Sequence, residues 1–598
     1  MDQRNITYLS VMLFFLFGIA CYNSQSLDSK NTFLNLDFET IKNDGSPKNW
    51  YTGGEGYKVE IDSLKFYSGK KSLRISKVTD GKFGVATSTF PVNEVKGKHI
   101  TYSGWIKTEN IITGNAGLWW RVDGKDGIIK IDNMSDRGAI GTAGWQEYKI
   151  DMDISEDAAN INFGVLLSGD GTAWFDNLQI KIDEQVYEQS EPLPFVPTDE
   201  QLEIVKNNSI HFSSCDPNNN SNDLTKLKKI FKDADIISLG EGTHGTKEFF
   251  QMKHRIVKYA AEQNENIVFA IEANMPEALR VNDYILYGKG DAITALGGLY
   301  FWTWNTEEVL NMIEWMRSYN LSGKGKIEFW GFDMQYPKLA IENLKKFLNE
   351  ADKTHADSLI TFLDEVSNVF EKVIKISPQE KYLLADYWYN NAIKVFNYFQ
   401  SNRSKYLQTY DTLFVDVQIQ NARILVQGGE SLFKNKQSRD ESMAENVVWT
   451  KEHIAKDRKM VLWAHNEHVS KIKGRMGNYL AQKFGDEMIV FGFAFYSGQY
   501  TAAGKNGLGI YTTSLPEPGS IEWILNKTGI QNMIIDFKNV TNNPKSDWLT
   551  QSLDFRSIGA MAMDYAFRPA VITKEYDALI FIDKTTPSKL LPKETRSK

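Results

Sequence analysis

Residues 240–248 read GEGTHGTKE and set an acid and a histidine, Glu241 and His244, among three glycines. The preceding run DADIISL is typical of a buried strand, and the following run FFQMKHRIVKYAAE has the spacing of an amphipathic helix. A glutamate beside a histidine can fix the tautomer of the imidazole and raise its basicity. The same stretch could also cradle a phosphate, bind a metal or form a simple turn, so its context has to decide.

Three other apolar runs, each typical of a buried strand, also end in acids or histidines. The run IVFAIEAN ends at Glu272, and IEFWGFDMQ ends at Asp333. The run MVLWAHNEH ends at His465 and His468. Because ligand sites of open parallel sheets form beyond the carboxyl ends of the strands, we expect these side chains to share one crevice with the GEGTHG turn.

Two of the alternatives for this crevice can be weighed from the motif itself. A phosphate cradle is disfavoured, because GEGTHG matches neither G-x-G-x-x-G nor a P-loop and its acid would repel phosphate. Two histidines and one glutamate are a common zinc set, so a divalent metal held by these side chains remains an alternative.

An acid/base site without a cofactor accounts for the pattern best. No G-x-S-x-G serine and no activated cysteine stands out as a nucleophile, so a directly activated water is favoured. We expect His244 to be the base and Glu241 or Glu272 to orient it. His465 and His468 would bind the reacting carbonyl or its oxyanion. The glycines would let the backbone turn sharply and let substrate approach.

The elements that must position these residues belong to a second domain, residues 201–590. Strand-like and helical runs alternate there, which predicts an α/β domain with a largely parallel sheet. Residues 336–457 are mostly helical and are expected to be an insertion that covers one end of the sheet. Specificity should lie in this insertion and in two aromatic loops, which would suit a ring-like substrate and contain Tyr300, Phe301, Trp302, Trp304, Tyr496 and Tyr500.

The first domain, residues 31–184, is predicted to be all-β. Short alternating runs separated by Gly, Asp and Asn favour a sandwich similar to the jelly-roll modules of secreted enzymes. Tryptophans in this region are expected to pack mainly in the core, while glycan binding is a weaker hypothesis, and they are Trp50, Trp105, Trp119, Trp120, Trp145 and Trp174. Residues 185–200, with three prolines and several acids, form a linker.

The N-terminus has the pattern of a bacterial lipoprotein signal. A short apolar run, TYLSVMLFFLFGIAC, ends at Cys21 and is followed by polar residues, so we expect a signal peptide at 1–20 and lipidation of Cys21. The segment 21–30 would then link a membrane anchor in the cell envelope, in the periplasm or at the outer membrane, to the first domain. Cys215 would have no disulfide partner. The net charge of −8 and the absence of a basic block argue against nucleic acid, and residues 591–598 look like a frayed tail.

Several motifs in order make residues 225–588 resemble the erythromycin esterase family. They include LGEGTHGTKEFFQMKHRIVKYAAE, FAIEAN, FWTWNTEEVLNMIEWMRSYN, FWGFDMQ, RDESMAENVVW, LWAHNEHVSK, FRSIG and YDALIFIDKTTPS. In that family water attacks an ester or lactone carbonyl, in a reaction generally described as metal-independent. The resemblance therefore implies a hydrolase of a small-molecule ester or lactone, with His244 as the general base.

The resemblance also implies roles for other residues. Lys253 stands where macrolide-degrading members carry arginine, so it is expected near the oxyanion but without the bidentate fork of an arginine. We expect Trp304 and Asp333 on the substrate side as well, and Arg439 and Asn446 behind the residues that touch substrate.

Family resemblance does not imply macrolide resistance, and the substrate cannot be read from the sequence. The alternatives are a metal-dependent hydrolase on the same site and a non-catalytic surface lipoprotein that binds glycans through residues 31–184.

Overall fold

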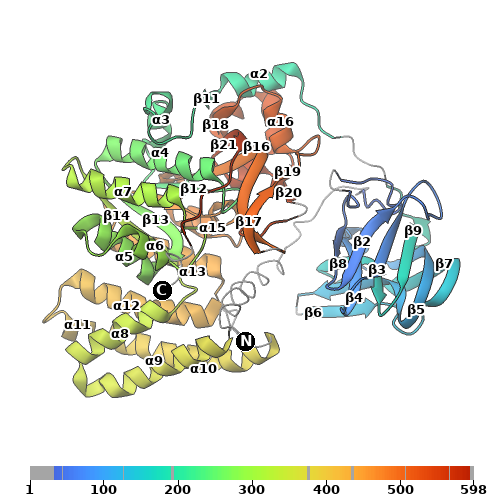
Figure 1. Ribbon diagram of the computed structural model, residues 1–598, viewed down its shortest axis with the longest axis horizontal. Helices are drawn as coiled ribbons and strands as arrows, with labels where there is room; N and C mark the ends of the chain where they lie inside the picture. Colours follow the sequence, from blue (N-terminus) through green and yellow to red (C-terminus); the bar gives the residue numbers. More distant parts are fainter. Residues whose placement is uncertain are drawn as a thin grey trace. The chain divides into compact units, whose positions relative to one another are not determined.

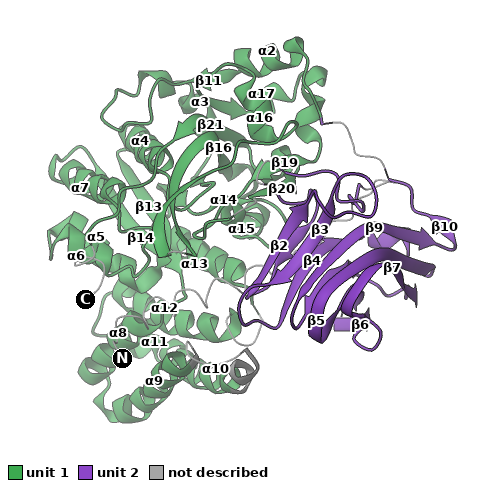
Figure 2. Cartoon of the chain, turned by 45° about the vertical axis from the view of Figure 1, so that its right-hand side comes forward, with its two compact units in different colours: residues 1–17, 195–598 green, residues 18–194 purple. Residues whose placement is uncertain are grey.

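The structure is a computed structural model that describes residues 33–42, 45–125, 127–189, 194–373, 378–431, 437–505, 507–563 and 566–592. The predicted signal peptide, the segment 21–30 with Cys21, and residues 593–598 of the predicted tail lie outside these ranges. The chain divides between Pro194 and Phe195 into two compact units (Figure 2). None of the described helices combines the length and the hydropathy that a bilayer span requires.

The first unit is an all-β domain in which every strand pair is antiparallel. Its sheet has the strand order β1-β4-β8-β5-β9-β3-β2, and off this path β6 and β7 pair with β5 while β10 pairs with β9. The strands are β1 (Tyr51–Gly53), β2 (Tyr57–Asp62), β3 (Ser72–Lys77), β4 (Phe83–Thr89), β5 (His99–Gly124), β6 (Gly127–Asp132), β7 (Ala139–Asp153), β8 (Asn160–Ser168), β9 (Thr172–Ile182) and β10 (Gln185–Val186).

Half of the tryptophans of this unit are buried. Trp50 and Trp120 lie in its core with Phe163, and Trp174 is also buried, whereas the other three are half-buried. The boundaries of the predicted linker 185–200 differ from the structure at both ends. Strand β10 continues the sheet to Val186, and helix α2 of the second unit begins at Asp199.

The second unit is built on a mixed sheet with the order β11-β18-β21-β16-β12-β15-β13-β14 (Figure 1). The strands from β21 to β14 are parallel to their neighbours in this order, whereas β18 and β11 run antiparallel at the other edge. The strands of this unit are β11 (Ser209–His211), β12 (Ile236–Leu239), β13 (Asn266–Asn274), β14 (Lys326–Asp333), β15 (Lys459–Trp463), β16 (Met488–Gly504), β17 (Gly507–Thr512), β18 (Asn532–Asp536), β19 (Leu553–Arg556), β20 (Phe567–Ala570) and β21 (Ala578–Thr585). Strand β17 pairs with β16, and β19 and β20 form a separate two-stranded sheet.

The parallel strands are apolar on both faces because helices cover both sides of the sheet. Along β13, Ile267, Phe269 and Ile271 pack into one core, and Val268 and Ala270 pack into the other. This alternation follows from the two-residue period of a strand. The first core is closed by helices α4, α5 and α7, and the second by α13, α15 and α16.

The helices of this unit are α2 (Asp199–Asn207), α3 (Leu227–Phe231), α4 (Lys247–Asn264), α5 (Met275–Tyr287), α6 (Ala292–Gly297), α7 (Glu307–Leu321), α8 (Lys338–Ala351), α9 (Lys353–Val373), α10 (Pro378–Ser401), α11 (Arg403–Tyr406), α12 (Thr412–Gly429), α13 (Arg439–His453), α14 (Asn466–Val469), α15 (Met476–Phe484), α16 (Ile521–Asn526), α17 (Phe537–Val540) and α18 (Ile572–Glu575).

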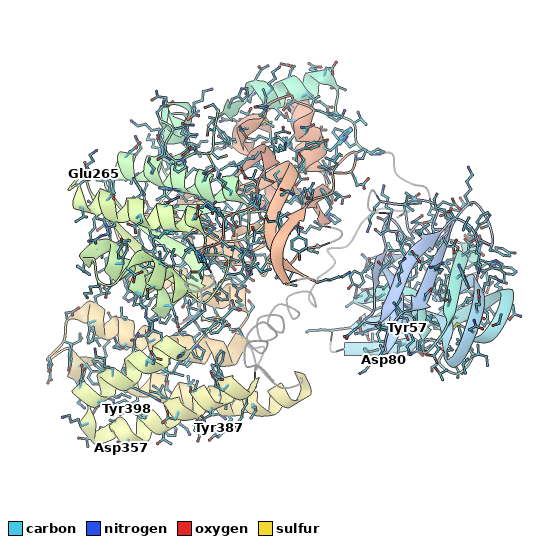
Figure 3. The ribbon with its side chains drawn as sticks, viewed as in Figure 1. Tyr57, Asp80, Glu265, Asp357, Tyr387 and Tyr398 are labelled. Atoms are coloured by element: carbon cyan, nitrogen blue, oxygen red, sulfur yellow. The ribbon has the colours of Figure 1, made fainter. Side chains whose placement is uncertain are left out.

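Helices α8 to α12 form a separate helical layer between β14 and α13 in the sequence, within the segment predicted as an insertion. They enclose a core of their own, and they lie together below the sheet in Figure 1. Buried Asp352 ties this layer together, because its Oδ2 accepts hydrogen bonds from Tyr398 (2.6 Å; labelled in Figure 3), Lys405 (2.8 Å) and Tyr406 (2.9 Å).

Candidate active site

The predicted site residues converge at the carboxyl ends of four neighbouring parallel strands. Glu241 and His244 follow β12, and Glu272 lies near the C-terminal end of β13. Asp333 ends β14, and the two histidines of AHNEH follow β15. Because the sheet order is β12-β15-β13-β14, these four strand ends are adjacent in space. The sheet therefore brings together side chains that are far apart in the sequence, as expected for a site at this edge.

The glycines of the GEGTHG loop permit close packing of the loop against its neighbours. A Cβ atom at Gly245 would lie 1.9 Å from the carbonyl oxygen of Thr501, and one at Gly240 would lie 2.2 Å from Asn466 Oδ1. Neither glycine has a positive φ. These glycines therefore make room for neighbouring protein atoms. This corrects the expectation that they make room for substrate or adopt a backbone angle that other residues avoid.

Glu241 and His244 form a buried hydrogen-bonded pair at the centre of the site. His244 Nδ1 lies 2.7 Å from Glu241 Oε1. The other carboxylate oxygen, Oε2, accepts from Lys253 Nζ (2.5 Å) and Trp463 Nε1 (2.7 Å). Burial raises the pKa of Glu241, but Lys253 and His244 more than offset this, so the pKa is below its usual value. An ionised Glu241 accepts a hydrogen bond from Nδ1–H of His244, which leaves Nε2 unprotonated with its lone pair available.

His244 Nε2 has no hydrogen-bond partner in the described part of the chain. The side chain is 8% exposed. Its ring lies 5.0 Å from that of His465 and 6.2 Å from that of Trp304, which it meets edge to face. A small molecule that reaches Nε2 would meet an imidazole of fixed tautomer among buried rings.

A second buried network surrounds Arg439, the first residue of α13. Its Nη2 donates to Glu272 Oε1 (2.8 Å) and Asp333 Oδ2 (2.8 Å), and its Nη1 lies 3.0 Å from His468 Nε2. Burial raises the pKa of Glu272, but His468 and Arg439 outweigh it, so the pKa lies well below its usual range. At 25% exposure, Arg439 is the most accessible cation of the two networks.

His468 lies between carboxylates. Its Nδ1 is 2.9 Å from Asp440 Oδ1, and its Nε2 is 3.4 Å from Glu272 Oε1. Burial lowers the pKa of His468, but the charges of Asp440 and Glu272 reverse the effect, so the pKa is raised. With a 15% exposed side chain, His468 can present a positive charge beside Arg439.

Both ring nitrogens of His465 bond to backbone groups and not to the crevice. Its Nε2 donates to the carbonyl oxygen of Ile558 (2.9 Å), and its Nδ1 accepts from the backbone N–H of Glu467 (3.2 Å) at the start of α14. Its backbone N–H donates to Glu272 Oε2 (2.9 Å). Burial lowers the pKa of His465 to about 4, and His244 adds to the effect. A neutral ring with both nitrogens engaged cannot donate to a carbonyl, which argues against the predicted carbonyl-binding role of this histidine.

Three residues predicted on the substrate side lie behind the site. Lys253 is fully buried, and its Nζ contacts Glu241 and lies 4.3 Å from the centre of the Trp463 ring. Trp304 is buried and donates its Nε1 hydrogen to the carbonyl oxygen of Glu272 (3.1 Å). Asp333 is fully buried beneath Arg439. These positions correct the expectation of direct substrate contact, because each polar group already has a protein partner.

Two further residues complete the site, and Asn446 supports it. Trp463, which the sequence analysis did not single out, donates a hydrogen bond to Glu241, and Asp440 contacts His468 Nδ1. Both stand inside the motifs LWAHNEH and RDESMAENVVW, so their position beside site residues was the available signal. Asn446 is fully buried and donates to the carbonyl oxygen of Phe332 (2.9 Å), which fixes α13 to the end of β14 behind the reacting groups.

The donor atoms fit proton transfer better than metal binding. Among the residues that the structure describes, no group of three or more His, Cys, Asp or Glu side chains is arranged to hold a metal ion. Nδ1 of His244 and both ring nitrogens of His465 and His468 already have hydrogen-bond partners. The two networks can instead provide one base, His244, and one positively charged surface, Arg439 with His468.

Comparison with known proteins supports the family resemblance that the motifs indicate. The profile of a family described as erythromycin esterase matches residues 261–585, beginning just after the His244 loop. Erythromycin esterase type II from Escherichia coli is 25% identical over 434 residues, which cover 65% of this chain and 99% of that protein. A Bacillus cereus protein of known crystal structure is 25% identical with a TM-score of 0.60, and the match covers 67% of this chain and 100% of that one. The crystal structure of a succinoglycan biosynthesis protein shares the fold at 23% identity and a TM-score of 0.54, covering 66% of this chain and 98% of the other.

Proposed function

Because the chain belongs to the erythromycin esterase family, we propose that it is a hydrolase in which His244 activates water for attack on a carboxylic ester or lactone. The observation that carries this proposal is the 2.7 Å contact between His244 Nδ1 and Glu241 Oε1, with Nε2 left without a partner in the described part of the chain. An imidazole held in this tautomer is a base at Nε2.

The first step is proton transfer from water to His244 Nε2. The hydroxide that forms adds to the carbonyl carbon, and the π electrons of the carbonyl bond move to its oxygen. The imidazolium is stabilised by the ionised carboxylate of Glu241, which Lys253 and Trp463 hold in place. This arrangement keeps the base aligned while the charge on the ring changes, so little reorganisation is needed during the reaction.

Donors that carry positive charge and can be reached from solvent are well suited to stabilise the oxyanion. Arg439 and His468 meet both conditions, since their side chains are 25% and 15% exposed and their Nη1 and Nε2 atoms lie 3.0 Å apart. We assign oxyanion stabilisation to this pair. In the second step the oxyanion collapses, the bond to the leaving alkoxide breaks, and His244 Nε2–H gives its proton to that alkoxide. The products are a carboxylic acid and an alcohol.

The charge of the site indicates which substrates it favours. Four carboxylates (Glu241, Glu272, Asp333 and Asp440) face the cations Lys253 and Arg439. With His468 positively charged as well, the site still carries one excess negative charge, which would repel an anionic substrate. We propose an uncharged or cationic ester or lactone.

The test is a screen of the purified chain against simple esters, lactones and macrolides, with the products identified by mass spectrometry. We expect hydrolysis by the wild-type chain and a loss of several orders of magnitude in the folded His244→Ala variant. Hydrolysis that survives His244→Ala unchanged would refute the assignment of the base. Activity that disappears with a chelator and returns with Zn²⁺ would favour the metal-dependent alternative.

Two proposals concern parts of the chain outside this site. We propose that Cys21 is lipidated after export and anchors the protein in the cell envelope, on the strength of the TYLSVMLFFLFGIAC pattern. We also propose that the β-sandwich, residues 31–184, can bind glycans, on the strength of its jelly-roll-like sequence pattern.

A further inference from the structure

The second unit contains a cavity of about 990 Å³ that none of the catalytic candidates line. One stripe of α4 forms a wall with Lys247, Gln251, His254 and Lys258, which follow each other at the three- to four-residue spacing of a helix face. Helix α7, the β16–β17 hairpin and residues 586–590 form the other walls. A volume of this size is in the range of small-molecule sites.

The charges that line this cavity are balanced. Three lysines face three carboxylates, and the six residues are Lys247, Lys258, Lys589, Asp216, Glu307 and Glu308. Lys589 Nζ and Glu307 Oε1 form an ion pair at 2.7 Å, and the backbone N–H of Lys589 donates to Glu308 Oε2 (3.1 Å). A cavity with no net formal charge does not select for an anion or a cation, which favours a neutral ligand.

Two of the lining residues carry a buried polar atom that lacks a partner. His254 Nε2 and Ser588 Oγ are both shielded from solvent and have no hydrogen-bond partner in the described part of the chain. Burial lowers the pKa of His254 to about 3, so its ring is neutral and Nε2 can donate or accept according to the tautomer. Both atoms are shielded from solvent, so they lie in the wall behind the cavity surface, and a ligand would bind the exposed polar atoms of the lining instead.

Aromatic and amide groups complete the lining. The half-buried Trp315 ring lies 5.2 Å from the His254 ring, and the side-chain amides of Gln251 and Asn311 also line the cavity. An aromatic ring offers a surface for the apolar face of a sugar, while amides and carboxylates can bind its hydroxyl groups. We propose that this cavity binds a neutral sugar or glycoside, at a site separate from the catalytic centre.

The wall of the cavity is joined to the catalytic loop. The backbone N–H groups of Thr501 and Ser588 both donate to the carbonyl oxygen of Gly245 (2.9 and 2.8 Å), which is the residue after His244. Thr501 Oγ1 also donates to the carbonyl oxygen of Ser588 (2.8 Å). A ligand seated here would therefore contact the segments that support the base without reaching the base itself.

Gly509 offers a way to fill the cavity. It lies in β17 and lines the cavity, a Cβ atom built on it meets nothing within 4 Å, and its φ is outside the left-handed region. Gly509→Phe should therefore occupy the ligand space without straining the strand. Leu321, the last residue of α7, is exposed and does not line the cavity, so Leu321→Phe is the control for added aromatic bulk on the surface of the same unit.

The experiment is a binding screen of the full chain against neutral glycans and their anionic counterparts, with hits measured by isothermal titration calorimetry. We expect saturable binding of at least one neutral glycan that is weakened at least tenfold by Gly509→Phe and kept by Leu321→Phe. Asn311→Ala, a change on the exposed surface of α7, provides a second variant and should also weaken binding.

Three results would overturn the proposal. One is the absence of any neutral glycan among the ligands. Another is binding that neither Gly509→Phe nor Asn311→Ala affects, which would assign it to another part of the chain. The third is binding of uronates or inorganic phosphate, but of no neutral glycan, in a manner sensitive to Gly509→Phe. Since the readout is binding, these outcomes are independent of whether His244 is the catalytic base.

Discussion

Replacement of Glu241 by glutamine is the most discriminating test of the catalytic arrangement. Glu241 Oε2 receives two hydrogen bonds, from Lys253 at 2.5 Å and Trp463 at 2.7 Å, whereas Oε1 faces only His244 at 2.7 Å. In a Glu241→Gln variant the single amide oxygen satisfies the two donors. The amide NH₂ must then point at His244 Nδ1 and donate to it.

This inversion changes the tautomer of His244. When Nδ1 accepts a hydrogen bond, the ring proton resides on Nε2, and the lone pair that should accept a proton from water is no longer there. A wrong tautomer in a comparable histidine–carboxylate pair of serine proteases lowers kcat by about 10⁴. We expect a loss of ~10³- to 10⁴-fold in kcat, or about 4–5.5 kcal/mol of activation free energy, with little change in KM.

The assay is steady-state hydrolysis of the best ester found in the substrate screen, combined with thermal unfolding to confirm that the variant folds. Glu262→Gln is the control, because Glu262 is an exposed acid on the same helix as Lys253 and should leave kcat within about twofold. A folded Glu241→Gln variant that keeps kcat within tenfold of the wild type would show that Glu241 does not set the tautomer of His244.

Three other predictions concern Arg439, His465 and Cys21. Arg439→Lys keeps the charge but loses the fork that reaches Glu272, Asp333 and His468, so kcat should fall about 10²- to 10³-fold. The control is Arg423→Lys, a change in an ion-paired arginine outside the site, which should leave kcat unchanged. Equal effects of the two changes would contradict the oxyanion assignment. The pKa of His465 is 6.5 in the unfolded chain but about 4 in the folded chain, so between these pH values the unfolded chain binds a proton that the folded chain does not. The free energy of unfolding should therefore decrease by about 3 kcal/mol as the pH falls from 6.5 to 4. Denaturant titrations of His465→Gln should lack this dependence on pH. Cys21→Ala should abolish incorporation of labelled palmitate in a bacterial host, and labelling that persists would refute lipidation at this residue.

The separation of roles among the three histidines illustrates what contacts add to a motif. In the sequence, His465 and His468 are equivalent, since both follow the same strand and both are candidates for binding a carbonyl. In the fold they differ, because His465 caps α14 and donates to Ile558, whereas His468 faces Asp440, Glu272 and Arg439. The difference depends on partners more than 90 residues away in the case of Ile558, which no local pattern specifies.

Arg439 and Lys253 exchanged their expected places for a similar reason. Lys253 follows the GEGTHG loop on the next helix, and the family resemblance implied a cation near the oxyanion at this position. In the structure, α4 instead places the Lys253 side chain beneath Glu241, where it is fully buried. Arg439 lies 195 residues after His244 in the sequence. Only the packing of α13 against the end of β14 brings its guanidinium to the crevice.

The sequence by itself determined the two-domain plan, the α/β character of the second domain and the strand ends at which the reactive residues stand. It could do so because hydrophobic periodicity and strand-end position are local properties. Only the tertiary structure decided which nitrogen of each histidine is available, which cations face the crevice, and that a second cavity lies behind the catalytic loop. Those features depend on burial and on hydrogen bonds between distant segments, and they exist only once the sheet has set the four strand ends side by side.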